Sequence, residues 1–222
     1  MAHNNILKEP KITAWIDTLK AAGCIVRDIA VLSELRRTNG ELLFALLDVD
    51  ASEPDGTKLM PYIFIRGHAC IIVPLLKNRD TRDERFLMVL QRRIAHGHQC
   101  LEFPAGMLDS NIDNPLGVAL RELHEETGLR ISENELHRLC EKPLHSSPGA
   151  CDEAVYYYGC IIELPDSVYR SFEGRLAGSK AENEHIQVTL KTRDEAEKKL
   201  MSLQAQLGFF LFEQARKRIE KS

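Results

Sequence analysis

Apolar residues near the start of the chain recur with the spacing of a helix. They stand at i, i+3, i+4 and i+7, on one helical face, and are Ile12, Trp15, Ile16 and Leu19. Gly23 ends the predicted helix. Two strand-like runs follow at residues 24–32 and 41–49, and a turn sequence at residues 38–40 lies between them. The pattern therefore predicts a small, β-rich N-terminal unit over residues 1–60.

A second, larger domain is predicted over residues 61–222, after a Pro- and Gly-containing loop at residues 52–56. The predicted elements are strands at 62–65, 69–76, 86–91, 136–140 and 154–163, a charged loop at 78–85, a helix at 115–127 and two closing helices. Four apolar residues share a face of the last helix: Leu203, Leu207, Phe210 and Leu211.

Composition and charge narrow the class of protein. The 222 residues are 44% hydrophobic and 28% charged, which is typical of a globular chain and excludes a disordered or fibrous one. The net charge of −4 argues against nucleic acid as a partner, because binding to phosphates needs a basic surface. The longest apolar run, residues 69–76, is far shorter than the ~20 residues of a membrane span. We therefore expect neither a nucleic-acid nor a membrane partner.

The six cysteines indicate a reducing compartment. None forms a Cys-x-x-Cys pair, and most lie in apolar segments such as residues 69–73, which favours buried thiols over disulfides. The first ten residues lack the apolar stretch of a secretory signal peptide. Both features predict a cytoplasmic protein.

The segment at residues 114–129 carries the strongest chemical signal. Asn114 is a favourable N-cap, Pro115 suits the first helical turn and Gly128 suits a left-handed helix end. The predicted buried stripe is Leu116, Ala119, Leu120 and Leu123, and the acids Glu122, Glu125 and Glu126 crowd the neighbouring arc. Like charges one turn apart destabilise a helix by about 0.2–0.5 kcal/mol a pair. Either this is a solvated acidic face or the acids hold a hard cation such as Mg²⁺.

Two other patterns resemble metal sites without completing one. Residues 109–113, with Asp-x-Asn-x-Asp, are similar to the start of a calcium-binding loop. The sixth position of that loop is Asn114 where Gly is needed, and the twelfth is Leu120 where Glu is needed. Residues 96–100, with His-x-His-x-Cys, could place three zinc-type ligands on one strand face, but no fourth ligand is near in the sequence.

Residues 121–129, Arg-Glu-Leu-His-Glu-Glu-Thr-Gly-Leu, resemble the core R-E-U-x-E-E-x-G-U of the Nudix hydrolase signature, in which U is aliphatic. The full signature is G-x5-E-x7-R-E-U-x-E-E-x-G-U. Asp113 stands where it has its first Glu, and six residues separate Asp113 from Gly106. The resemblance implies a Nudix α/β/α sandwich with a mixed β-sheet. It also implies hydrolysis that depends on Mg²⁺, with Mn²⁺ as a possible substitute.

Further segments are similar to those of the ADP-ribose and ADP-sugar diphosphatases, and most of all to the plant-type ADP-glucose branch. They are Arg66-Gly67-His68-Ala69, Gln91-Arg92-Arg93, the Glu-Phe-Pro-Ala-Gly-Met of residues 102–107, Ser147-Pro148-Gly149 with Glu153, and Glu182-Asn183-Glu184. This resemblance implies cleavage of a nucleotide sugar such as ADP-ribose or ADP-glucose into AMP and a sugar phosphate. It also implies that residues 1–60 form a dimerisation subdomain. A homodimer is expected on physical grounds too, because so short a β-rich unit presents strand edges that need covering.

The resemblance assigns a role to each site residue. The metal ligands would be the backbone carbonyl of Ala105 and the carboxylates of Glu122, Glu126 and Glu184, with Glu125 in reserve. Glu182 would accept the proton of the attacking water, and Arg121 would hold the glutamates in position. The substrate contacts would be Arg66, Arg93, Met107, Ser147, Pro148, Gly149 and Glu153.

Two alternative functions remain open at this point. The same chemistry could act on GDP-mannose or on a dinucleotide, because the residues before Arg66, Met60-Pro61-Tyr62, differ from those of some ADP-ribose enzymes. The domain could also sense a nucleotide without cleaving it, although a pure sensor has no need of so many clustered acids.

Overall fold

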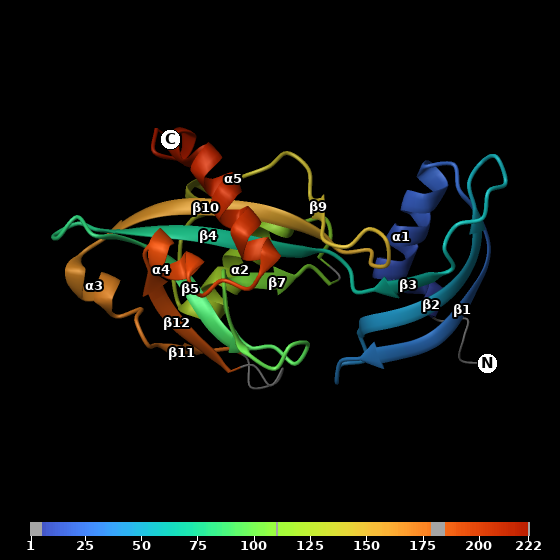
Figure 1. The fold of residues 1–222 in the computed structure, drawn as a ribbon, viewed down its shortest axis with the longest axis horizontal. Coiled ribbons are helices and arrows are strands. Elements are labelled where there is room, and N and C mark those ends of the chain that lie inside the picture. Colours follow the sequence, from blue (N-terminus) through green and yellow to red (C-terminus); the bar gives the residue numbers. More distant parts are fainter. Residues whose placement is uncertain (1–5, 110, 179–184, 222) are drawn as a thin grey trace. The chain divides into compact units, whose positions relative to one another are not determined.

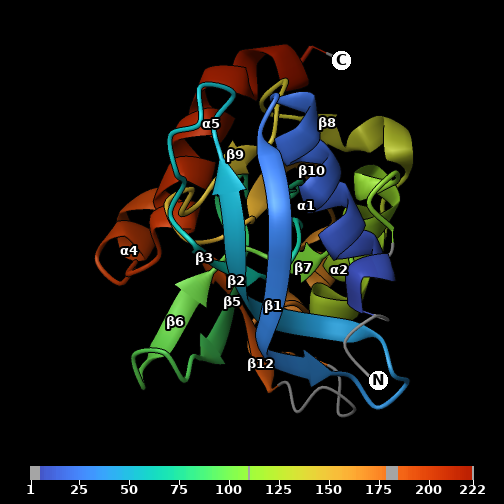
Figure 2. The ribbon, with the colours of Figure 1, turned by 90° about the vertical axis from the view of Figure 1, so that its right-hand side faces the viewer.

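The computed structural model describes residues 6–109, 111–178 and 185–221, and these residues form both helices and strands (Figures 1 and 2). The helical elements are η1 (Ile6–Lys8), α1 (Pro10–Ala21), α2 (Pro115–Thr127), η2 (Glu133–Glu135), α3 (Asp166–Arg170), α4 (Arg193–Glu197) and α5 (Leu203–Ile219). The strands are β1 (Ile25–Arg36), β2 (Leu42–Ser52), β3 (Tyr62–Ile65), β4 (Ala69–Asn78), β5 (Glu84–Arg92), β6 (Gln99–Glu102), β7 (Ala105–Met107), β8 (His137–Arg138), β9 (Leu144–His145), β10 (Ala154–Leu164), β11 (Leu176–Ala177) and β12 (Ile186–Lys191). The predicted α/β class is confirmed.

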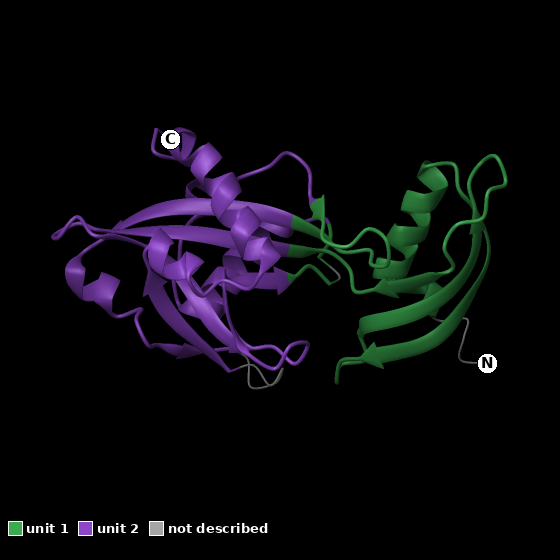
Figure 3. Cartoon of the chain, in the orientation of Figure 1, with its two compact units in different colours: residues 1–69, 107–112, 144–155 green, residues 70–106, 113–143, 156–222 purple. Residues whose placement is uncertain are grey.

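The chain divides into two compact units (Figure 3). The first consists of residues 1–69, 107–112 and 144–155. The second consists of residues 70–106, 113–143 and 156–222. The first unit thus contains two short segments from the middle of the chain, which no local pattern in the sequence indicates.

In the first unit, α1 covers one face of a three-stranded antiparallel sheet of order β1-β2-β3 (Figures 1 and 2). Alternate residues of β2 point toward α1 and form the centre of the core. The buried core residues are Ile6, Ile12, Leu42, Ala45, Leu47, Val49, Ala51 and Ile65, and Trp15 and Ile16 pack against them. The helical face predicted from the apolar spacing is therefore the face that packs on the sheet.

In the second unit, the strands follow the order β11-β12-β5-β4-β10-β8, and β6 pairs with β5. Helix α2 lies on one side of this sheet, and α4 and α5 lie on the other (Figures 1 and 2). Coverage of both faces explains why nearly every residue of β4 is buried. The ring of Phe86 packs against Phe209 and Phe212, with centroid distances of 4.8 and 5.4 Å, and so joins α5 to the sheet.

The buried face of α5 differs from the predicted one. Leu203 is 76% exposed and Phe210 is 56% exposed. The buried residues are Ala205, Gly208, Phe209, Phe212, Ala215 and Ile219. Two apolar stripes of α5 have helical spacing, and the small residues of one stripe determine that it is the one that packs on the sheet. A methyl group on Gly208 would lie only 3.2 Å from Phe103 and Val73, so the helix approaches the sheet on its glycine side.

The buried stripe of α2 was predicted only in part. Ala119 and Leu123 are buried as expected, whereas Leu116 and Leu120 are half-buried. Val118, Glu126 and Thr127 are buried in addition. A charged residue in this stripe reflects the site described below and cannot be read from hydrophobicity.

Two further observations concern the cysteines and the lengths of the helices. The six cysteines carry free thiols; Cys70, Cys100 and Cys160 are buried, and the other three are half-buried. None of the helices in the described ranges is both long enough and apolar enough to cross a membrane.

Candidate active site

Helix α2 begins and ends at the residues that the sequence marks. The Asn114 side chain accepts a hydrogen bond of 3.0 Å from the N–H of Gly117, which caps the first turn. Gly128 adopts a left-handed conformation with φ of 81° and donates its N–H to the carbonyl of His124 at 2.7 Å. The guanidinium of Arg175 lies against Gly128, where positive charge complements the helix dipole. These contacts fix the ends of the helix that carries the acids.

Glu126 is a buried carboxylate that meets strand β7. Glu126 is 7% exposed, and its Oε2 accepts a hydrogen bond of 3.0 Å from the N–H of Ala105. A buried carboxylate is costly unless it is hydrogen-bonded or binds a cation. The bond to Ala105 therefore ties the helix to the backbone that the resemblance assigned as a ligand.

Glu122 lies one turn earlier and touches the next residue of β7. A methyl group on Gly106 would lie 2.5 Å from Glu122 Oε1 and closer still to the carbon atoms of that side chain. Only glycine leaves room for this approach. Glu122 Oε1 also accepts a hydrogen bond of 3.2 Å from Arg121 Nη2, so the guanidinium of Arg121 lies beside this acid.

Cys70 lies on strand β4, which pairs with β7. Its thiol donates to the carbonyl of Gly106 at 3.6 Å. Burial raises the pKa of Cys70 to about 12, so the group stays a neutral thiol at physiological pH. Cys70 thus acts here as a weak hydrogen-bond donor to β7 and not as a nucleophile.

The donor set suits a hard cation. Two carboxylates one turn apart and a backbone carbonyl are oxygen ligands, and Mg²⁺ fills its remaining positions with water and substrate phosphates. Within the described ranges, no group of three or more His, Cys, Asp or Glu side chains is arranged to hold a metal ion. Glu125 is exposed on α2. Glu182 and Glu184 lie outside the described residues.

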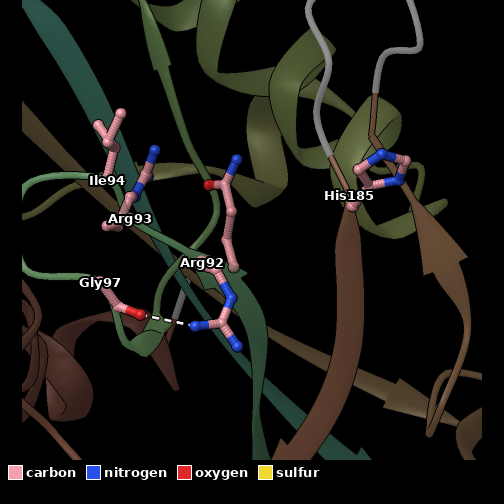
Figure 4. A pocket seen from close by; sticks show the side chains of 6 residues that line it. Arg92, Arg93, Ile94, Gly97 and His185 are labelled. Atoms are coloured by element: carbon pink, nitrogen blue, oxygen red, sulfur yellow. Dashed lines mark hydrogen bonds between the residues drawn. The ribbon is translucent and has the colours of Figure 1, made fainter.

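Arg93 of the second unit is already paired. Its Nη2 and Nε donate to Glu102 Oε2 at 2.7 and 3.0 Å, which fixes the direction of the guanidinium. A pocket of about 400 Å³ lies beside this pair and is lined by Gln91, Arg92, Arg93, Ile94, Gly97 and His185 (Figure 4). In it, Arg92 Nη1 donates to the carbonyl of Gly97 at 2.6 Å, and His185 stands apart from that pair (Figure 4).

The remaining predicted substrate contacts belong to the first unit. Arg66 Nη1 lies 2.9 Å from Glu153 Oε1, and the Glu153 side chain is only 7% exposed. The N–H of Ala150 donates to the carbonyl of Ser147 at 3.1 Å, which closes a tight turn around residues 147–149. Met107 is the half-buried last residue of β7.

The sequence did not indicate two residues, Asp152 and His68, that hold the backbone next to Arg66 and Glu153. Asp152 Oδ1 accepts hydrogen bonds from the N–H of Arg66 at 2.8 Å and from that of Gly67 at 3.1 Å. His68 Nδ1 accepts the N–H of Ala154 at 3.2 Å, and burial lowers the pKa of His68, which favours the neutral imidazole. The partners are more than 80 residues apart, so no local spacing could reveal them.

Comparisons with known proteins agree with the fold and the motif. The chain is 27% identical to Nudix hydrolase 14, chloroplastic, of Arabidopsis thaliana over 169 residues, which is 73% of this chain and 54% of that protein. It is 42% identical over 62 residues to an ADP-sugar pyrophosphatase of Mus musculus, 28% of each chain. It is 41% identical over 71 residues to an ADP-ribose pyrophosphatase of Mycobacterium tuberculosis, 32% of each chain. The matches thus span about half or less of these curated relatives.

A solved structure of an ADP compounds hydrolase has the same fold. It superposes with a TM-score of 0.62 and covers 88% of this chain and 95% of its own, at 17% sequence identity. The NUDIX domain profile matches residues 68–207, which include β4, β7 and all of α2. Because this match covers more than half of the sequence and contains the acids of α2, the chain belongs to the Nudix family.

Proposed function

We propose that the chain hydrolyses the pyrophosphate bond of a nucleoside diphosphate sugar, with ADP-ribose or ADP-glucose as substrate and AMP and a sugar phosphate as products. The contact of Glu122 and Glu126 with the Ala105–Gly106 backbone carries this proposal. The pyrophosphatase names of the mouse and mycobacterial relatives favour an ADP-linked substrate over GDP-mannose.

The acids of α2 would bind the metal together with the carbonyl of Ala105. Mg²⁺, or Mn²⁺ in its place, would supply charge neutralisation at the pyrophosphate oxygens and lower the pKa of a bound water. Glu126 stays oriented through its bond to the N–H of Ala105, and Glu122 stays oriented through Arg121. A fixed arrangement matters because phosphoryl transfer depends almost entirely on positioning and charge stabilisation.

Glu182 is our candidate for the proton acceptor and Glu184 for a further metal ligand. Both assignments rest on the resemblance of residues 182–184 to the corresponding segment of the ADP-sugar enzymes. A polar segment that precedes a strand is a reasonable place for a general base, since loops on a rigid scaffold often carry catalytic groups.

The substrate contacts are proposed from their chemistry. Glu153 and Glu102 orient Arg66 and Arg93, and oriented guanidinium groups bind phosphate in a forked geometry. Arg66 Nε is a buried donor without a hydrogen-bond partner among the described residues, which favours an added acceptor such as a phosphate or sugar oxygen. Met107 and the turn of Ser147, Pro148 and Gly149 are further proposed substrate contacts, and they rest on the resemblance of these segments to those of the ADP-sugar enzymes.

We also propose a homodimer that forms through residues 1–60, with residues 61–222 as the hydrolase domain. The face of the β1–β3 sheet opposite α1 carries exposed apolar side chains, namely Leu35, Leu46, Tyr62 and Phe64, of which Leu46 and Phe64 are cross-strand partners. Phe44 packs on Phe64 within this face, with ring centroids 5.3 Å apart. A second copy related by a two-fold axis would remove these side chains from water.

A substrate panel tests the proposal. Purified protein is incubated with ADP-ribose, ADP-glucose, GDP-mannose and diadenosine polyphosphates, with Mg²⁺, Mn²⁺ or EDTA, and kcat/KM is measured from product release. We expect metal-dependent release of AMP and a sugar phosphate, fastest from an ADP-sugar. Equally weak cleavage of every compound would contradict the ADP-sugar assignment. Saturable binding of ADP-ribose without AMP release would show a sensor instead.

A further inference from the structure

The pocket of about 400 Å³ beside Arg93 lies wholly in the second unit (Figure 4). Its volume falls in the range of about 300–1,000 Å³ that is typical of small-molecule sites. The residues that line it are Gln91, Arg92, Arg93, Ile94, Gly97 and His185. None of these six described residues is acidic, whereas two are arginines and one is a histidine. The pocket therefore has the size of a ligand site and favours a negatively charged ligand.

The turn that follows β5 fixes the guanidinium of Arg92. The N–H of Arg93 donates to the carbonyl of His98 at 3.1 Å, and the N–H of Gly97 donates to the carbonyl of Arg93 at 2.8 Å. Gly97 has φ of 76°, which glycine adopts without strain, and its carbonyl accepts a hydrogen bond of 2.6 Å from Arg92 Nη1 (Figure 4). No other side-chain hydrogen bond joins Arg92 to a described residue. Its Nε–Nη2 edge therefore remains for a ligand, and two adjacent N–H donors of this kind bind an oxyanion through two parallel bonds.

Gln91 is a buried polar residue that lines the same pocket. It is only 9% exposed, and its side chain makes no hydrogen bond with any other described residue. A buried amide without a partner is costly, and most such groups in folded proteins are hydrogen-bonded. His185 lines the pocket apart from Arg92, and its ring adds a further N–H donor (Figure 4). The pocket thus presents donors of three residue types that a ligand with several acceptor oxygens would satisfy.

We propose that this pocket is a subsite for a phosphate monoester that the substrate carries in addition to its pyrophosphate. The inference rests on the proposed function, because Arg93, a proposed substrate contact, also lines the pocket. A phosphate monoester carries about 1.5 to 2 negative charges at neutral pH and has three acceptor oxygens. It would accept two bonds from Arg92 and further bonds from Gln91 and His185, whereas a neutral sugar would leave the charge of Arg92 unpaired. The chain would then prefer an ADP-sugar that is phosphorylated on a sugar ring over the unphosphorylated compound.

The experiment measures binding without turnover, in EDTA, by isothermal titration calorimetry of the full-length chain. The compounds are ADP-ribose and two phosphorylated forms of it, with the added phosphate on the adenosine ribose or on the terminal ribose. Wild type is compared with Arg92→Met and Arg92→Lys, which should fold because Arg92 is exposed. Arg82→Met is the matched control, because the Arg82 side chain is 84% exposed in the same unit and loses the same charge.

We expect one phosphorylated form to bind wild type about 10- to 100-fold more tightly than ADP-ribose does. This preference should disappear in Arg92→Met, remain in part in Arg92→Lys, which keeps the charge but not the fork, and stay at the wild-type level in Arg82→Met. Equal dissociation constants of the three compounds in wild type, or a preference that Arg92→Met retains, would overturn the inference.

Two further measurements separate the possible outcomes. Inorganic phosphate is titrated into wild type and Arg92→Met; binding that depends on Arg92, with equal dissociation constants of the three ADP-ribose compounds, would overturn the substrate-borne source and assign the pocket to a free anion. Hydrolysis of the same compounds is then measured with Mg²⁺. A preference in binding without hydrolysis of any compound would refute the proposed function and support the subsite. Hydrolysis of ADP-ribose without a preference in binding would support the proposed function and refute the subsite.

Discussion

The close approach of Gly106 to Glu122 predicts that Gly106→Ala removes activity while it preserves the fold. Gly106 does not have a positive φ, so alanine adopts its backbone without strain and restricts the unfolded chain, which adds about 0.4–1 kcal/mol of stability where space allows. Space is the difficulty, because the new methyl group would lie 2.5 Å from Glu122 Oε1. The carboxylate must move by roughly 1 Å, and such a misplacement costs up to about 100-fold in rate.

A 100-fold loss corresponds to about 2.7 kcal/mol of transition-state stabilisation. The assay is kcat/KM on an ADP-sugar at saturating Mg²⁺, together with the melting temperature. Gly56→Ala serves as the contrast, because Gly56 has φ of 91° and nothing within 4 Å of the added methyl group. We expect the opposite result there, a loss of about 1–2 kcal/mol of stability with activity retained. Full activity in Gly106→Ala would show that Glu122 does not need its present position and would refute the reasoning.

Four other outcomes follow from the site and the fold. Glu126→Gln should remove most activity and metal binding with an unchanged or slightly higher melting temperature, because Gln is nearly isosteric and relieves repulsion between acids; a much lower melting temperature would make the residue structural. Glu182→Gln should reduce kcat by ~10²–10⁴ with little change in KM, whereas added Mg²⁺ should partly restore Glu184→Gln; the reverse pattern would exchange their roles. Burial lowers the pKa of His68 below its usual 6.5, so the folded protein binds this proton less readily than the unfolded protein does. The free energy of unfolding should therefore fall as the pH drops through 6.5. Denaturant titrations at several pH values should show that this free energy depends less on pH in His68→Gln than in wild type. Leu46→Glu on the exposed face of β2 should shift the proposed dimer to monomer in analytical ultracentrifugation; a monomeric wild type would exclude the dimer.

Local signals predicted the elements of the fold well. The cap, the first-turn proline and the terminal glycine of α2 each act within a few residues, so the sequence delimits this helix correctly. The strands β4 and β10 were evident from their apolar runs, because burial on both faces leaves no polar alternation. The helical faces were harder to predict, since α5 carries two apolar stripes and the choice depends on how closely Gly208 approaches the sheet.

The site was predictable only where the motif is continuous. The acids of α2 lie in one stretch of nine residues, and their chemistry and spacing point to a cation. The residues that orient the other groups come from distant parts of the chain, as Asp152 does for the backbone of Arg66 and His68 does for that of Ala154. Neither partner has an unusual local context, so its role follows from the tertiary fold alone.

Helix α2 shows why function and local stability conflict in this chain. Glu122 and Glu126 repel each other one turn apart, and burial of Glu126 adds a cost that a solvated acidic face would avoid. The structure meets this cost with neighbours that are not part of the helix pattern, namely the N–H of Ala105 and the room left by Gly106. A segment that only had to pack would place apolar residues at these positions, as α2 does at Ala119 and Leu123. Acids that occupy these positions against their local preference, and that a backbone contact supports, are what the proposed metal site would require.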